Sequence, residues 1–360
     1  DKRWGTFGSV GVGWNIHNEK WVKDNTSLFQ MLKLRASWGI TGGTNFYPFQ
    51  AMTIYSFNDP LIKGVSYGSR LGALIKGFGN TDLKWQRTEK RNIGVDFELF
   101  NRRLTGYFNA YSDISKDVLI DVNLAPSVGF TSYKENLGEV KNSGVEVNLK
   151  GTVISNPEKR IRWDLFVNAV YNKNELLDLA GVNEIIDGYM INRIGEPYQS
   201  FYVYEVDGLF KSDEEAAAYE KQYGNPWSLP FKGGDFRIKD ADGDGKLTDK
   251  DRVVKGTQQP KTTFGLTLSA GWKNFDLSVF MQGVTGTNRY FSRDVVGSFI
   301  GDTSHPSTNW LDAWTPENTN AEWPRLFLEE NSISSPQRVN SSFWCMNTNY
   351  LRIKNVNFGY

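Results

Sequence analysis

The sequence predicts an all-β protein: a transmembrane antiparallel β-barrel with long loops at one end. Three observations predict this fold class. About nine segments alternate apolar residues with polar or small ones. The connections between these segments are short and long in turn. The 360-residue chain also combines 14% aromatic residues and 35 glycines with only 12 prolines. Soluble β-proteins can share that composition, so the two patterns carry the prediction.

The balance of residues excludes several classes of function. Lys+Arg and Asp+Glu both number 41, so nothing indicates a nucleic-acid partner. A lone cysteine, Cys345, rules out an intramolecular disulfide framework. Only His17 and His305 are present, which leaves little for histidine catalysis or zinc. The mean hydropathy is −0.47, and no run reaches the length of a spanning helix, which a β-barrel does not need.

The strands are predicted from the two-residue period. The first places Val10, Val12 and Trp14 on one face, with glycine and asparagine between them. The last changes parity near Asn355, which predicts a β-bulge. That last segment is 350–360, and the segments between the first and the last are 32–40, 93–99, 104–112, 145–149, 163–169, 264–272 and 275–281.

The connection lengths predict the orientation. Tight turns at 100–103, 155–159 and 273–274 alternate with excursions at 41–88, 113–142, 173–260 and 283–349. The connection at 15–30 should be short by this alternation, but it is longer than the three tight turns. A soluble sandwich has no reason to gather its long loops at one end. An outer-membrane barrel does, because its turns are short on the periplasmic side and its loops long outside.

The two faces of each strand differ in polarity, as a lipid-facing and a lumen-facing side should. The side chains expected to face lipid include Val95, Phe97, Val145, Val147, Leu266 and Leu268. Those expected to face a wet lumen are Asp96, Glu98, Glu146, Lys150, Asp164 and Thr267. Tryptophans at or near strand ends, where an aromatic girdle would place them, are Trp14, Trp38, Trp163 and Trp272. The alternative is that they are core tryptophans of a sandwich.

The longest excursion contains a cation-binding pattern. Oxygen ligands are expected from Asp240, Asp242, Asp244, the Lys246 carbonyl, Thr248 and Asp251, at positions one, three, five, seven, nine and twelve. A glycine at position six permits the sharp turn. Aspartate replaces the usual glutamate at position twelve, and no pair of helices flanks the loop. The pattern therefore predicts a structural calcium ion that pins the loop rather than a calcium sensor. The alternative is a solvated Asp/Gly-rich turn.

Two enzyme-like patterns are weaker. Residues 64–68 match a nucleophile elbow around Ser66, with His305 downstream, but no apolar strand or clear helix flanks them. Glu214 and Glu215 could suggest glycosidase chemistry. A capping box that opens a short helix from Ser212 to Gly224 explains them sufficiently. No enzymatic activity is expected.

Motifs from the first residues to the last resemble one family in order. They are RWGTFGSVGVGWNI (3–16), LKLRASWGITG (32–42), NTDLKWQRTE (80–89), NSGVEV (142–147), GDFRIKDADGDGKLTDKDR (234–252), WTPEN (314–318), WPR (323–325) and YLRIKN (350–355). The family is the SusC/RagA-type TonB-dependent transporters of Bacteroidetes, whose motif matching residues 80–89 usually has Glu where Gln86 stands. The resemblance identifies residues 1–360 as the C-terminal part of the barrel, with 173–260 as an extracellular loop.

That resemblance carries further expectations. It implies a fragment of a 22-stranded plugged barrel, in the bacterial cell outer membrane, with the plug and remaining strands absent from this chain. It implies import of an oligosaccharide, or alternatively a peptide, driven by TonB through the missing N-terminal region and capped by a SusD-like surface lipoprotein. Loop aromatics that could stack on sugars are Tyr198, Phe201, Tyr202, Trp227 and Trp310. Trp314 and Trp323 lie in family-wide segments and are expected to pack. The competing function is a soluble calcium-stabilised β-sandwich that binds carbohydrate.

Overall fold

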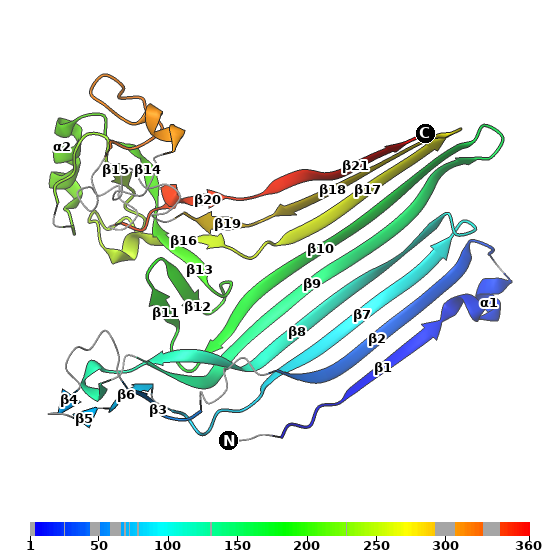
Figure 1. Ribbon diagram of the computed structural model, residues 1–360, viewed down its shortest axis with the longest axis horizontal. Helices are drawn as coiled ribbons and strands as arrows, with labels where there is room; N and C mark the ends of the chain where they lie inside the picture. The colour runs from blue at the N-terminus through cyan, green and yellow to red at the C-terminus, as the bar shows by residue number, and fades with distance from the viewer. Residues whose placement is uncertain are drawn as a thin grey trace.

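The computed structural model describes residues 4–24, 26–43, 51–57, 66–67, 70–71, 73–77, 79–129, 132–227, 229–291, 307–326 and 339–360. One nine-stranded antiparallel sheet dominates this part of the chain (Figure 1). In spatial order its strands are β1 (Ser9–Asn15), β2 (Phe29–Gly43), β7 (Gln86–Leu99), β8 (Leu104–Asn123), β9 (Ser132–Asn156), β10 (Ile161–Leu179), β17 (Thr262–Trp272), β18 (Phe275–Thr285) and β21 (Tyr350–Gly359). All nine predicted segments are strands of this sheet, and the all-β class is confirmed.

The two ends of the sheet differ as the connection lengths predicted (Figure 1). At one end lie tight turns and the short helix α1 (Lys20–Lys23), which occupies the one longer connection on that side. The turn after β7 places Phe100, Asn101 and Arg102 at φ of 54°, 56° and 64°. Lys273 begins the two-residue turn after β17 with φ 54°, the left-handed value that tight hairpins require. The long excursions gather at the other end.

Several strands run further than expected. The excursion predicted at 113–142 is mostly sheet, since β8 and β9 pair as far as Asn123 opposite Ser132. That prediction of loop extent was wrong because the two-residue alternation is interrupted, not because the strands end: the register shifts between Ser115 and Leu119, where Asp117 has φ 58°. The predicted bulge is confirmed: Phe280 pairs with Asn355 and Met281 with Ile353, which leaves Lys354 as the extra residue.

The strand register separates the two faces. One cross-strand row is entirely apolar and consists of Val95, Phe108, Val147, Ala169 and Phe264. The next row, one residue along, faces the other way and consists of Asp96, Tyr107, Asn148, Asn168 and Gly265. The sequence therefore predicted correctly which residues share a face.

The polar face carries a cross-strand network. The Arg35 guanidinium forms an ion pair with Asp96 at 2.8 Å and donates to the Asn109 side chain at 2.6 Å. Asn109 in turn donates to Glu146 at 3.2 Å. Gly94 lies between these strands, and a Cβ there would collide with the Asn109 carboxamide and the Arg35 guanidinium. A glycine is thus needed for Arg35 to reach across β7.

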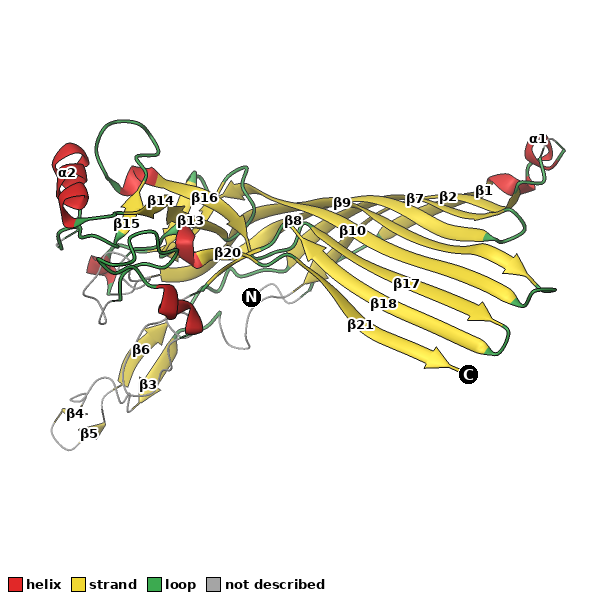
Figure 2. Cartoon of the chain, turned by 90° about the horizontal axis from the view of Figure 1, so that it is seen from above, coloured by secondary structure: helices red, strands yellow, loops and turns green. Residues whose placement is uncertain are grey.

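The excursions build a second body, the loop domain, at the end of the sheet opposite α1 (Figure 2). Its elements are the sheet β11 (Glu184–Asp187), β12 (Met190–Arg193), β13 (Ser200–Tyr204) and β16 (Arg252–Thr257), the pairs β14 (Val206–Leu209) with β15 (Phe236–Ile238) and β19 (Asn288–Tyr290) with β20 (Cys345–Asn347), and helix α2 (Asp213–Tyr223). Two further short pairs are β3 (Ile54–Phe57) with β6 (Ala73–Gly77) and β4 (Ser66–Tyr67) with β5 (Arg70–Leu71). Within the described ranges, no helix is long and apolar enough to cross a membrane.

The main buried core lies in the loop domain rather than on the large sheet. Phe201, Phe210 and Phe236 are at most 2% exposed, and Trp344 is fully buried. This core draws residues from both long excursions, the one after β10 and the one after β18. The excursions therefore fold together, which their separate positions in the sequence did not indicate.

Candidate metal centre

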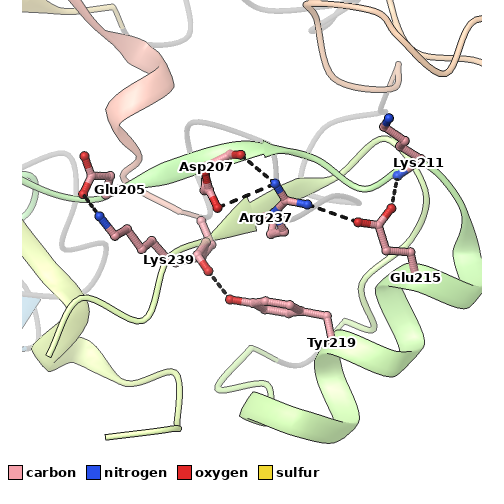
Figure 3. Close-up of polar contacts among 8 residues, drawn as sticks. Glu205, Asp207, Lys211, Glu215, Tyr219, Arg237 and Lys239 are labelled. Carbon is pink, nitrogen blue, oxygen red and sulfur yellow. Dashed lines mark hydrogen bonds and ion pairs between the residues drawn. The ribbon is translucent and has the colours of Figure 1, made fainter. Parts of the chain in front are cut away.

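The acidic loop lies between β15 and β16, which belong to different small sheets. Figure 3 shows the polar contacts that hold β15 in place: Arg237 lies between Asp207 of β14 and Glu215 of α2. Its guanidinium is 3.2 Å from the Glu215 carboxylate and donates to the Asp207 carbonyl at 2.9 Å. Tyr219 of α2 donates to the carbonyl of Ile238, the last residue of β15. The loop therefore starts from a fixed strand end.

Lys239, the residue before the loop, is anchored by Glu205 (Figure 3). Lys239 Nζ is 3.4 Å and Lys255 Nζ 2.8 Å from the two Glu205 oxygens. The hydrogen bond from Lys255, with the smaller contribution of Lys239, holds the pKa of Glu205 below its ordinary value. Both ends of the acidic loop are thus tied through one carboxylate.

Helix α2 has the predicted N-cap residue, but not the second hydrogen bond of a capping box, in which the Glu215 carboxylate would accept from the Ser212 amide. Ser212 Oγ accepts from the Glu215 amide at 3.3 Å, and Gly224 ends the helix with φ 76°. The Glu215 carboxylate accepts from the Lys211 amide at 2.7 Å. Glu214 and Glu215 therefore lie in the first turn of a surface helix, where carboxylates favour the helix dipole.

Three of the predicted ligands converge. The carboxylates of Asp240, Asp242 and Asp244 each offer an oxygen within 4.8 Å of the others. The chain turns tightly around them, with Gly243 and Gly245 at φ 74° and 81°. A Cβ at either glycine would meet no atom, so the backbone angle is what requires glycine there.

Asp251 has a different position from the other three carboxylates. It is fully buried, and its two oxygens accept from the amides of Ala241 at 2.8 Å and Thr248 at 2.7 Å. It closes the loop by joining its first and last turns, and it lies outside the three-carboxylate cluster. The structure thus brings together three of the four predicted carboxylates.

The far end of the loop is anchored in the core. Leu247 is 4% exposed and donates its amide to the Tyr223 carbonyl at 2.8 Å. Asp249 accepts from the Tyr204 hydroxyl at 2.6 Å, and burial, together with this bond, raises the pKa of Tyr204. Thr248 Oγ1 accepts from the Lys250 amide at 3.2 Å. A single 3-10 turn, Asp249–Asp251, ends the loop, and β16 follows it.

The donor set suits a hard cation. Carboxylate and carbonyl oxygens without sulfur or imidazole are what calcium prefers. Most of the carboxylate oxygens in the cluster accept backbone amides: Asp240 from Gly243 and Gly245, and Asp244 from Lys246 at 2.8 Å. An oxygen that accepts one amide keeps a lone pair for a cation.

A buried ion pair near the loop was not anticipated from the sequence. Asp235 is fully buried, and the Arg325 Nε is 2.8 Å from its carboxylate. The Trp314 ring lies against Gly233 and Gly234, where any Cβ would collide with it. The contact joins residues 90 positions apart. Both partners lie within quoted motifs, yet no pattern in either motif indicates the pairing.

The other sequence candidates do not form a site in the described residues. Of the elbow pattern, only the backbone of Ser66 and Tyr67 is described, as β4, and Gly64, Gly68 and His305 lie outside the described residues. Phe201, Tyr202 and Trp310 are 2%, 6% and 6% exposed, so their rings are core and not free to stack on a sugar. The half-buried remainder are Tyr198, Trp227 and Trp314. Trp323 is buried, as expected for packing.

Comparison with known proteins identifies the class. Residues 1–334 match the family model described as TonB dependent receptor-like, beta-barrel, so the chain belongs to that family. Within it the chain is of the SusC/RagA type. It is 29% identical over 382 residues to TonB-dependent receptor SusC of Bacteroides thetaiotaomicron, covering 100% of the chain and 34% of the relative. It is 28% identical over 373 residues to TonB-dependent receptor P3 of Formosa agariphila, covering 100% and 35%.

A solved structure agrees. The structure of the RagAB peptide transporter superposes with a TM-score of 0.76 at 26% identity, covering 99% of this chain and 38% of that one. The predicted family is confirmed. The chain spans about a third of the length of the curated relatives it matches. Family membership, together with one continuous nine-stranded sheet, argues against the soluble sandwich.

Proposed function

We propose that this chain forms part of the wall and the extracellular loops of an outer-membrane transporter that imports a nutrient with energy delivered through TonB. The observation that carries the proposal is the nine-stranded sheet, whose neighbouring rows are apolar on one face and polar on the other. A sheet in lipid with a wet lumen needs that division. Membership of the TonB-dependent receptor family supports the proposal independently.

We propose an oligosaccharide as the imported substrate, with a surface lipoprotein of the SusD type as the lid. The SusC/RagA resemblance supports both. A peptide is the second candidate, because a transporter of similar structure, RagAB, is a peptide transporter.

Uptake in the natural host tests this proposal. Deleting the gene that encodes these residues should abolish accumulation of one labelled oligosaccharide or peptide, and removing TonB should have the same effect. An affinity tag on the loop domain should co-purify a lipoprotein. Undiminished uptake of every oligosaccharide and peptide tested, in both deletions, would contradict the proposal.

We also propose that Asp240, Asp242 and Asp244 bind one calcium ion, with the Lys246 carbonyl, Thr248 and Asp251 completing the site directly or through water. The role is structural, because the loop joins two sheets and both of its ends are anchored. The clustered carboxylates support it, since three negative charges within 4.8 Å repel one another without a cation.

Binding and proteolysis test the calcium proposal without reference to transport. Calcium titrated into the metal-free protein should bind at one site in this loop and slow tryptic cleavage at Lys246 and Lys250. Asp242→Ala should remove both effects and loosen residues 233–256, whereas Asp187→Ala, which removes an exposed carboxylate of β11 outside the loop, should retain them. An unchanged cleavage pattern with and without calcium would argue for the solvated turn.

A further inference from the structure

We infer that the outward face of β7–β10 binds the phosphate-bearing headgroup of an anionic membrane lipid. The inference rests on the proposed membrane position of the sheet. The site is a cross-strand row of hydrogen-bond donors, here called the donor row: Arg91, Ser112, Ser143 and Lys173.

The strand register places these four side chains together. Arg91 pairs with Ser112, Ser112 with Ser143, and Ser143 with Lys173. Paired residues point to the same face, and strands lie about 4.8 Å apart. The donor row therefore extends roughly 14 Å across four neighbouring strands, which lie side by side in Figure 1.

The donor row borders the apolar face. Two residues along each strand, and hence on the same side, lies the row Ile93, Ala110, Val145 and Tyr171. On β7 the outward face changes from Ile93 to the cationic Arg91 within two residues, and on β10 it changes from Tyr171 to Lys173 within two residues. On the neighbouring strands β17 and β18, the outward face ends in the paired threonines Thr262 and Thr285. The cationic border is thus a feature of β7–β10.

The carboxylates near the donor row lie further from the apolar face than the cations do. Arg91 bonds Glu89 at 2.7 Å and Lys173 bonds Glu175 at 2.8 Å, each two residues towards the loop domain. The Arg91 and Lys173 side chains are 60% and 58% exposed, against 24% and 28% for their acids. Glu89 is also held by the Trp38 indole at 2.8 Å. The positive groups are therefore the ones presented to the lipid border.

This arrangement fits a phosphate more closely than other groups. A guanidinium donates in a planar fork that matches phosphate oxygens, an ammonium acts as a point charge, and serine hydroxyls donate between them. Exposed ion pairs along one strand are weak, so a phosphate can join or replace the glutamates at little cost. A lipid is favoured over a soluble anion because the donors continue directly into the apolar rows that acyl chains would cover.

Lipid selectivity measured by electron spin resonance tests this inference. The natural polypeptide that contains these residues would be reconstituted in phosphatidylcholine bilayers with spin-labelled phosphatidic acid or phosphatidylcholine. The wild type should show motionally restricted lipid and prefer phosphatidic acid at least about twofold, since each Lys or Arg near an anionic surface favours it by roughly fivefold. High salt should reduce the preference.

Matched variants separate the outcomes. Arg91→Gln with Lys173→Gln should bring the preference close to one. Lys33→Gln with Lys90→Gln removes the same charge from the polar face and should leave it unchanged. Restricted lipid without selectivity, or selectivity that survives the first pair of changes, would overturn the lipid site while the membrane barrel stands. If the wild type restricts no lipid at all, the proposed membrane position itself fails.

Discussion

Single residues in the acidic loop have two different roles that the sequence pattern treats as one. Asp240, Asp242 and Asp244 face one another at the surface, whereas Asp251 is buried and holds two backbone amides. The spacing of oxygen ligands predicted which residues converge, because a turn of this length with glycines at fixed places brings alternate side chains inward. It could not predict that the Asp251 carboxylate, at the twelfth position, accepts hydrogen bonds from two backbone amides and lies outside the cluster. That difference depends on the shorter reach of aspartate.

The two roles predict different responses to mutation. Asp251→Ala should destabilise the loop with or without calcium, because it leaves the amides of Ala241 and Thr248 without an acceptor, each at a cost of about 1–3 kcal/mol. Asp242→Ala should matter mainly when calcium is present. Hydrogen exchange of residues 233–256, in chelator and in calcium, measures both. Equal protection of the two variants in chelator would contradict the division of roles.

At the scale of elements, the strands were predictable only where one face of the sheet is apolar and the other polar. There the two-residue period is clear, and each of the nine predicted segments is a strand. Beyond that zone the register of β8 and β9 shifts between Ser115 and Leu119, and consecutive apolar residues break the two-residue period, so the pattern ends before the strand does. The sequence did not predict the loop domain for another reason: the core of this domain joins segments that are far apart in the chain.

The ion pair of Asp235 and Arg325 makes a prediction about how these segments dock. Asp235→Leu should destabilise the attachment of residues 307–326 to β15, by at most about 3–5 kcal/mol, because it leaves the half-buried Arg325 guanidinium without its charge partner. Adding Arg325→Met should restore part of the loss. Limited proteolysis of 307–326 in the two variants compares them. A double variant that is more sensitive than the single one would contradict this account.

Neighbouring positions on β17 should differ in their tolerance of charge. Leu266 belongs to the apolar face and Thr267 to the polar face. Leu266→Arg, near the bilayer midplane, should cost about 2–4 kcal/mol, and Thr267→Arg far less. Unfolding of the reconstituted natural protein in urea gives both values. Similar costs at the two positions would contradict the assignment of faces.

At the scale of the whole molecule, the sheet is a wall with two chemically distinct sides and a folded domain at one end. Family, fold class and the gathering of the long connections at one end of the sheet followed from the sequence, because each depends on patterns repeated over the full chain. The identity of the substrate did not follow from the sequence. Three of the loop aromatics that could have contacted a sugar are core residues, and the chain covers about a third of its relatives.

The central claim is that β17 forms part of a wall with lipid on one side and a lumen on the other. Single cysteines at positions 264–270, introduced after replacing Cys345, test it in native outer membranes. Burial raises the pKa of Cys345 to about 11, so this thiol reacts slowly, and replacing it removes the background that remains. Positions 264, 266, 268 and 270 should resist water-soluble thiol reagents and react with lipid-borne ones. Position 267 should label from the lumen. Protection of the even positions by protein contact, with no access for lipid-borne reagents, would contradict the membrane wall.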